Sequence, residues 1–163
     1  MPSAALLVVD MLNPYDHEDA DALAESAVHA VEPLRALLVR ARDVGADTVD
    51  LVYVNDNHGD FAATRHDLVE RALAGRRPEL VKPLIPDDDC AFLQKVRHSV
   101  FYGTALDHLL RQREVETVIL TGQVTEQCIL YSALDAYVRH YDVRVAHDAV
   151  ASIDADLGTA ALL

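Results

Sequence analysis

Short apolar runs alternate with amphipathic segments along the chain, and this alternation constrains the fold more than any other feature. The runs that we expect to form strands are Ala5–Val9, Thr48–Val54, Cys90–Val96, Thr117–Leu120 and Val143–Ala146. The segments that we expect to form helices are Ala22–Val44, His66–Ala74, Thr104–Arg113 and Thr125–His140. Strands that alternate with helices form a parallel sheet covered on both faces. The sequence therefore predicts an α/β protein with a three-layer Rossmann-like fold.

Proline and glycine punctuate this pattern. Pro33 lies inside the first helical segment and predicts a kink or a restart there, and Gly45 ends the segment. The stretch Arg76–Asp89 holds three prolines and is typical of a long loop, which is often functional in a compact domain. One short helix can follow from Asp154.

Length and charge narrow the function. The chain has 163 residues, which predicts one domain over residues 1–163, and its formal charge of −13 argues against nucleic acid or an anionic membrane as the partner. The apolar run before Asp10 is too short for a signal peptide or a membrane span. Cys90 and Cys128 both lie in expected regular elements, which favours free thiols in a reducing cytoplasm.

The segment around Cys128 presents a thiol at the edge of the expected sheet. An apolar strand ends in a glycine turn at Gly122, and Cys128 follows in the first turn of a helix, where the macrodipole favours the thiolate. Asp10 closes the first strand and Lys95 the third, and ligands of such sheets bind at the carboxyl ends of the strands. A thiolate, a carboxylate that moves protons, a stabilising ammonium and backbone donors for an oxyanion are the parts of a cysteine hydrolase.

Each of these residues also has a structural interpretation. A cysteine in a helix is often a small buried apolar side chain, Asp10 can cap a turn, and Lys95 can leave the sheet for water. Cys90 lies inside an expected strand, so we expect it in the core. Glu126, two residues before Cys128, should oppose thiolate formation unless it points to solvent.

The histidines suggest a metal site only weakly. Asp56 and His58 have the spacing of half a metal site, and His66 could be a third ligand, but such pairs are common in loops by chance. We therefore expect no metal and no other cofactor. The remaining histidines that have no ligand spacing are expected at the surface or in structural roles: His98, His108, His140 and His147.

Three motifs together resemble the isochorismatase-like superfamily of cysteine hydrolases, over nearly the whole chain. They are Val8–Asn13, Lys95–Thr104 and Thr121–Cys128. The resemblance implies that Asp10, Lys95 and Cys128 are catalytic. It also implies a cis peptide between Gln123 and Val124, with the amides of Val124 and Cys128 as oxyanion donors.

The resemblance also suggests a subclass. Members that hydrolyse a vinyl ether need no thiol, so Cys128 favours cleavage of a C–N bond in a small molecule through an acyl-thioester. The alternatives are a metal-assisted nicotinamidase, which Asp56 and His58 would serve, a vinyl-ether hydrolase, and a non-catalytic small-molecule binding protein. The sequence Asn55–Gly59 resembles a subgroup without metal.

Loop positions give candidate pocket walls and an assembly. The side chains that we expect around the substrate are Tyr15, Asn55, Phe61, Tyr102 and Tyr131. The resemblance implies a homodimer or a larger homo-oligomer. It also implies a last helix and a sixth strand beyond the fifth, whereas the chain stops at Leu163, so either the protein is short or the chain is truncated.

Overall fold

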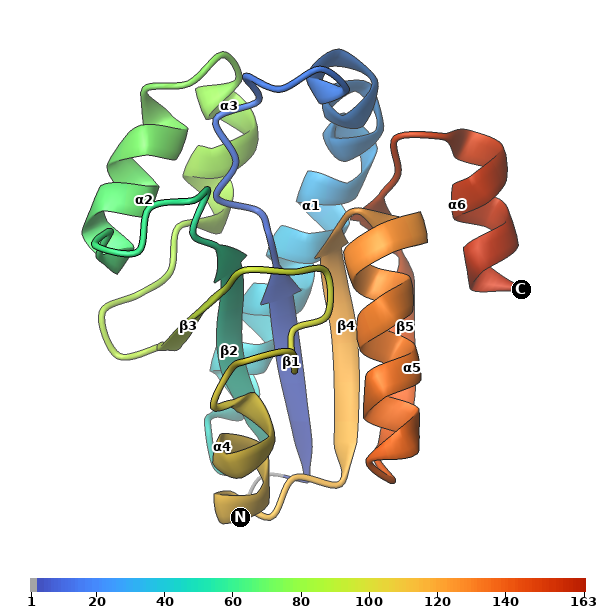
Figure 1. Cartoon of the computed structure of the whole chain (residues 1–163). Helices are drawn as coiled ribbons and strands as arrows, with labels where there is room; N and C mark the ends of the chain where they lie inside the picture. Colours follow the sequence, from blue (N-terminus) through green and yellow to red (C-terminus); the bar gives the residue numbers. More distant parts are fainter. Residues whose placement is uncertain (1–2) are drawn as a thin grey trace.

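The computed structural model describes residues 3–163, which form a central sheet with helices on both sides (Figure 1). The elements in chain order are β1 (Ala4–Val9), α1 (Ala20–Val44), β2 (Val49–Asp56), α2 (Arg65–Leu73), α3 (Pro78–Val81), η1 (Lys82–Leu84), β3 (Ala91–Lys95), α4 (Leu106–Gln112), β4 (Thr117–Gln123), η2 (Thr125–Ile129), α5 (Leu130–Val138), β5 (Asp142–Ala151) and α6 (Ala155–Leu162).

The sheet has five strands in the order β3-β2-β1-β4-β5, and every neighbouring pair is parallel. The chain therefore starts in the middle of the sheet, adds β2 and β3 on one side, and crosses over to add β4 and β5 on the other. All carboxyl ends lie at the same edge, which is the upper edge in Figure 1. The α/β fold class expected from the alternation is confirmed.

The two faces of β1 show why its run is apolar throughout. Leu6 and Val8 pack in the cluster that includes α1, α2 and α3, whereas Ala5, Leu7 and Val9 pack in the cluster that includes α4 and α5. Successive side chains of a strand point to opposite faces, so a strand buried on both faces has no polar alternation. The three layers follow from this double burial.

The helices differ from expectation in two places. α1 runs unbroken past Pro33, so the expected restart is wrong. The stretch Arg76–Asp89, expected as a loop, holds the short helix α3 and the 3-10 turn η1. Pro78 begins α3, where its fixed φ suits the first turn and its missing N–H costs nothing.

The segments that follow β3 and β4 also differ from the expected helices. The expected single helix from Thr125 begins as a π-helical turn, η2, before α5. Thr104 does not serve as the cap residue of α4, because that position is taken by Ala105, although the Thr104 hydroxyl accepts the N–H of Leu106 at 3.3 Å. β4 and β5 are both longer than the apolar runs that predicted them.

Gly122 allows β4 to lie tightly against β1. Its φ is +105°, and a Cβ atom added there would lie 2.1 Å from the carbonyl oxygen of Val9. Only glycine combines that backbone conformation with that approach. Since Asp10 follows Val9, the close contact fixes the turn after β4 beside the turn after β1.

Within residues 3–163, no helix is both long enough and apolar enough to cross a membrane.

Candidate active site

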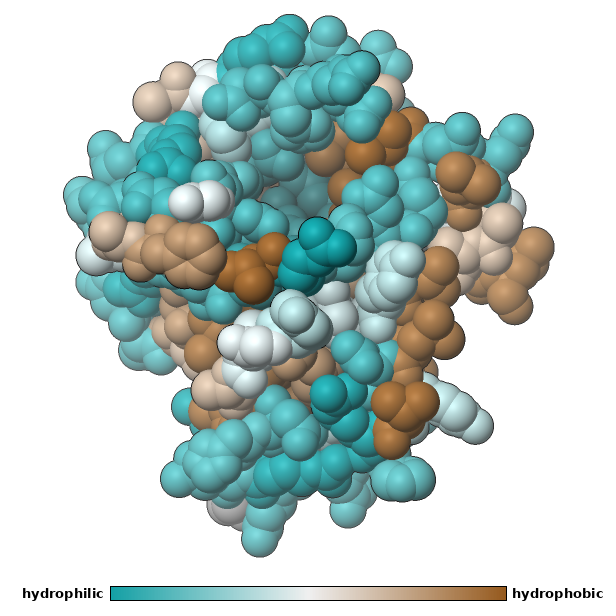
Figure 2. Space-filling model, in the orientation of Figure 1, coloured by the Kyte–Doolittle hydropathy of each residue, from teal (hydrophilic) through white to brown (hydrophobic). Residues whose placement is uncertain are grey.

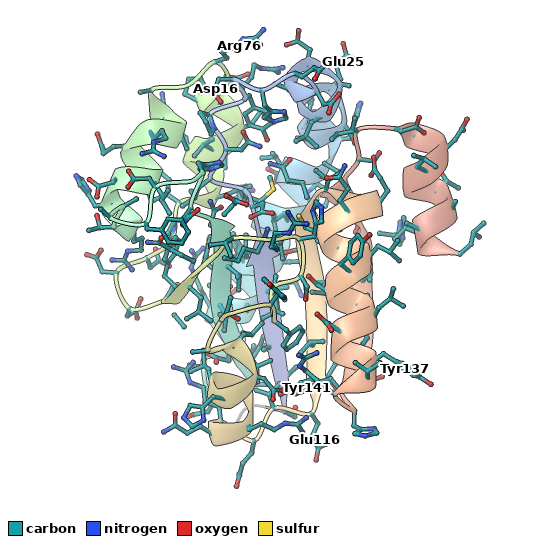
Figure 3. The ribbon with its side chains drawn as sticks, in the orientation of Figure 1. Asp16, Glu25, Arg76, Glu116, Tyr137 and Tyr141 are labelled. Atoms are coloured by element: carbon teal, nitrogen blue, oxygen red, sulfur yellow. The ribbon has the colours of Figure 1, made fainter. Side chains whose placement is uncertain are left out.

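The carboxyl edge of the sheet brings polar side chains from four neighbouring strands together. Asp10 follows β1 with a left-handed backbone (φ +55°), and its N–H donates to the carbonyl of Val54 in β2. Asp56 and Lys95 are the last residues of β2 and β3 and are register partners. Figure 3 shows Asp16 and Arg76 on the loops beyond this edge, and Glu116 and Tyr141 at the opposite edge.

Asp10, Lys95 and Cys128 lie in contact, as the strand-end positions predicted. The Nζ of Lys95 is 2.8 Å from Oδ2 of Asp10 and 3.5 Å from Sγ of Cys128. Oδ1 of Asp10 accepts the backbone N–H of Asp56 at 2.8 Å, which orients the carboxylate. Lys95 is only 1% exposed, so its ammonium is held inside the protein by these partners and by the carbonyl of Arg97. A buried ammonium needs such pairing to stay charged.

Electrostatics within the site favour a neutral thiol and a charged lysine. Burial, followed by the negative charge of Asp10, raises the pKa of Cys128 to about 12, although Lys95 and a backbone hydrogen bond of Val124 act to lower it. Burial opposes the charge of Lys95, yet Asp10, Cys128 and Asp56 raise its pKa above the ordinary value. The helix N-terminus is expected to favour the thiolate, whereas burial and the charge of Asp10 act in the opposite direction on the pKa of Cys128.

The turn before Cys128 has the backbone that the resemblance implied. The peptide between Gln123 and Val124 is cis, as expected. The Gln123 amide donates to the carbonyl of Asp10 at 2.8 Å, so this turn is tied to the end of β1. The backbone hydrogen bond of Val124 to the thiol places its amide beside Sγ.

The five expected pocket residues occupy three kinds of position. Tyr15 is buried and its hydroxyl donates to Oε1 of Gln123 at 3.3 Å. Asn55 is buried and bonds both to the N–H and to the carbonyl of Leu12, which fixes the loop after β1. Phe61, Tyr102 and Tyr131 are exposed.

The Asp56–His58 pair is engaged within the protein. Nε2 of His58 lies 3.1 Å from the carbonyl oxygen of Leu12, and Oδ1 of Asp56 accepts the His58 N–H. The other Asp56 oxygen lies 4.0 Å from Nζ of Lys95. His66 is exposed on α2. Within residues 3–163, one group of side chains has its possible metal-ligand atoms within 4.8 Å of one another. It consists of Asp87, Asp89 and Cys90 and does not include Asp56, His58 or His66.

His98 is the site residue that the sequence analysis missed. Its Nδ1 lies 3.8 Å from Sγ of Cys128, and its ring stacks on Tyr131. The signal was available in the sequence, because His98 follows Lys95 by three residues in the turn that leaves the same strand. Ligand spacing among the histidines was the wrong criterion, since the partner of His98 is a thiol.

Comparisons with known proteins identify relatives that match nearly the whole chain. The family model described as Isochorismatase domain matches residues 4–163. The chain is 32% identical over 148 residues to the uncharacterized isochorismatase family protein YaaI of Bacillus subtilis, covering 91% of this chain and 80% of that protein. It is 31% identical over 160 residues to maleamate amidohydrolase of Pseudomonas putida, covering 93% and 74%. N-carbamoylsarcosine amidase from Thermoplasma acidophilum has a similar solved structure, with a TM-score of 0.74, 30% identity and coverage of 98% and 90%.

Proposed function

Because the chain belongs to the isochorismatase family of hydrolases, we propose that it cleaves a C–N bond of a small amide through an acyl-thioester on Cys128. The observation that carries this proposal is the contact of Lys95 with both Asp10 and Cys128. Burying a lysine costs desolvation energy, and buried charges of this kind are common at functional sites. Here the ammonium can stabilise the negative charge that develops when the thiol attacks.

The first half of the reaction forms the acyl-enzyme. Asp10 contacts the thiol by charge and by hydrogen bond, so it receives the thiol proton as Sγ attacks the carbonyl carbon. The ammonium of Lys95 stabilises the thiolate that develops, and it holds Asp10 in place. Burial and Asp10 raise the pKa of the thiol, so the proposed reaction needs a group that takes its proton, and Asp10 is assigned that role.

The second half releases the acid. The tetrahedral oxyanion is stabilised by the amides of Val124 and Cys128, of which the Val124 amide lies beside Sγ. Ammonia or an amine leaves, and water then hydrolyses the thioester and restores the thiol. Phe61, Tyr102 and Tyr131, which are exposed, would surround the substrate, whereas buried Tyr15 and Asn55 hold the turn after β4 and the loop after β1.

Relatives support an amide as the substrate class. Maleamate amidohydrolase and N-carbamoylsarcosine amidase both act, by their names, on C–N bonds of small molecules. The surface is hollowed beyond the carboxyl ends of the strands, where a molecule of this size would enter (Figure 2). The acidic net charge and the Asp10–Lys95–Cys128 cluster suit a small substrate rather than a nucleic acid.

The proposal is tested by ammonia release from a panel of small amides, ureas and ring imides. The unchanged protein is compared with Cys128→Ala and with Cys90→Ala, which removes the other free thiol as a matched control. We expect Cys128→Ala to lose activity by at least about 10³-fold with an unchanged circular dichroism spectrum, and Cys90→Ala to retain it. Full activity in Cys128→Ala would overturn the mechanism.

A homo-oligomer is the assembly that we propose. Figure 2 shows apolar atoms along the side formed by α5 and α6, and Figure 3 shows Tyr137 pointing away from the sheet there. The exposed apolar side chains on this side are Tyr131, Leu134, Tyr137, Val138, Leu157 and Leu162. Sedimentation should show a dimer or larger for the unchanged protein and a monomer for Tyr137→Glu with Leu134→Glu; a monomer in both cases would contradict the assembly.

A further inference from the structure

His98 contacts the thiol of Cys128, as Lys95 does. Its Nδ1 lies 3.8 Å from Sγ of Cys128, while Lys95 lies 3.5 Å from the same sulfur. Lys95 is 1% exposed, whereas His98 is exposed in the turn after β3. The sulfur therefore contacts both a buried ammonium and the imidazole of an exposed residue.

The ring of His98 is held in a defined orientation. It stacks on Tyr131 with ring centroids 5.3 Å apart and an interplanar angle of 17°. Tyr131 belongs to α5, which follows directly from the turn that carries Cys128. The stack thus connects the turn after β3 to the helix that follows the nucleophile, and it orients the imidazole beside the thiol. Within residues 3–163, no hydrogen bond reaches the other ring nitrogen, Nε2.

Asp10 receives the thiol proton in the proposed mechanism, and both of its oxygens also have other partners. Oδ2 pairs with Lys95 at 2.8 Å and Oδ1 accepts the N–H of Asp56 at 2.8 Å. Each carboxylate oxygen of Asp10 thus has a partner other than the thiol. An amine needs a proton on its nitrogen as the C–N bond breaks, and His98 is an exposed titratable residue in contact with Sγ.

We propose that His98 is a further catalytic residue, which acts as general acid for the departing amine and then as general base for the hydrolytic water. This inference rests on the proposed acyl-thioester chemistry and extends it. Imidazole is suited to both roles because it can donate and accept a proton near neutral pH. A leaving nitrogen on the carbon bonded to Sγ would come within hydrogen-bond reach of Nδ1.

The protons balance over one turnover. As Sγ attacks, the S–H proton goes to Asp10; as the C–N bond breaks, the electron pair stays on nitrogen, which takes the proton from the imidazolium of His98. Water then attacks the thioester carbon, and neutral His98 accepts its proton as the new C–O bond forms. When the C–S bond breaks, the sulfur takes its electron pair and recovers the proton from Asp10. Asp10, Cys128 and His98 all return to their starting states.

An activated ester separates the two roles of His98. p-Nitrophenolate leaves an ester without needing a proton, so acylation of Cys128 by p-nitrophenyl acetate should proceed without the general acid. Deacylation of the same acetyl-enzyme should still need the general base. The experiment therefore measures the burst of p-nitrophenolate and the steady-state rate for the unchanged protein, His98→Gln, Cys128→Ala and His108→Gln. His108 is a matched control, because it is exposed on α4, which lies at the end of the molecule opposite the carboxyl edge of the sheet (Figure 1).

We expect His98→Gln to keep the burst and to lose about 10²-fold or more in the steady-state rate. His108→Gln should match the unchanged protein. Imidazole in the buffer should restore part of the turnover of His98→Ala, because the side chain is exposed and its vacated space opens to solvent. His98 lies at the surface, so circular dichroism should show the same fold in each variant.

The outcomes separate the two proposals. If His98→Gln keeps both the burst and the steady-state rate, or loses the burst as well, His98 does not have the role proposed. If Cys128→Ala releases p-nitrophenolate as fast as the unchanged protein, the acyl-thioester itself is wrong.

Discussion

Glu126 anchors Ile153 across the fold: its Oε1 accepts the backbone N–H of Ile153 at 2.9 Å and that of Asp154 at 2.8 Å. The carboxylate is thus directed at the connection between β5 and α6, and its Oε2 is buried with no hydrogen-bond partner among the described residues. From the sequence, Glu126 was compatible with a reactive Cys128 only if its side chain pointed to solvent. The structure instead uses its charge to hold the chain end against the turn that carries Cys128.

Removing this anchor should destabilise the protein. Glu126→Ala leaves the amides of Ile153 and Asp154 without their acceptor, so we expect the free energy of unfolding to fall by about 1–3 kcal/mol. Glu126→Gln keeps an acceptor oxygen and should lose less. Urea unfolding of both variants measures this order, and an equal loss in the two would contradict it.

Asp10 should suppress the reactivity of the thiol that it serves. Its negative charge is, after burial, the main cause that raises the pKa of Cys128 to about 12. In a Cys90→Ala background, Asp10→Asn should therefore speed the alkylation of Cys128 by iodoacetamide at mildly alkaline pH while abolishing hydrolysis. Lys95→Met should slow alkylation, because Lys95 lowers the thiol pKa. Slower alkylation in Asp10→Asn would show that the charge has the opposite effect.

The same shift predicts a loss of stability at alkaline pH. Burial and Asp10 raise the pKa of the Cys128 thiol from its ordinary value of 9.0 to about 12, so above pH 9 the unfolded chain binds fewer protons than the folded protein. The free energy of unfolding must then fall as pH rises, by at most about 1.4 kcal/mol per pH unit from this group. Cys128→Ala lacks this contribution, so its unfolding free energy should fall less steeply between about pH 8 and 10.5. Identical slopes would contradict the raised pKa.

Gly122 and Gly45 offer a matched pair for the close contact of β4 with β1. Both have positive φ values, +105° and +81°, but a Cβ atom on Gly45 meets nothing within 4 Å, whereas on Gly122 it would lie 2.1 Å from the Val9 carbonyl oxygen. Gly45→Ala should cost about 1–2 kcal/mol from backbone conformation alone. Gly122→Ala should cost about 3 kcal/mol or more, because overpacking is added. Comparable melting temperatures would show that β4 can move away from Val9.

Local patterns made much of the fold predictable. The apolar run before Asp10 and the periodicity of the segment ending at Val44 depend on nearest neighbours in sequence, so strands, helices and the parallel sheet could be predicted from them. The position of Asp10, Lys95 and Cys128 at strand ends followed from the same pattern, because all parallel strands end at one edge.

Elements whose formation depends on distant contacts were predicted less well. Pro33 does not interrupt α1, because residues of the helix both before and after Pro33 are buried in the core. The short helix from Pro78 has too few residues to show a period, so composition alone made it look like loop.

The sequence by itself determined the order of strands and helices, and with it which residues reach the carboxyl edge, since these depend on local periodicity. Only the tertiary structure decided the strand order, the burial that raises the pKa of Cys128, the approach of His98 to its sulfur, and the partner of Glu126. Each of these depends on burial and on distances between segments far apart in the chain. A one-dimensional pattern places residues at an edge, but the charge and reactivity there depend on how much water the folded chain excludes.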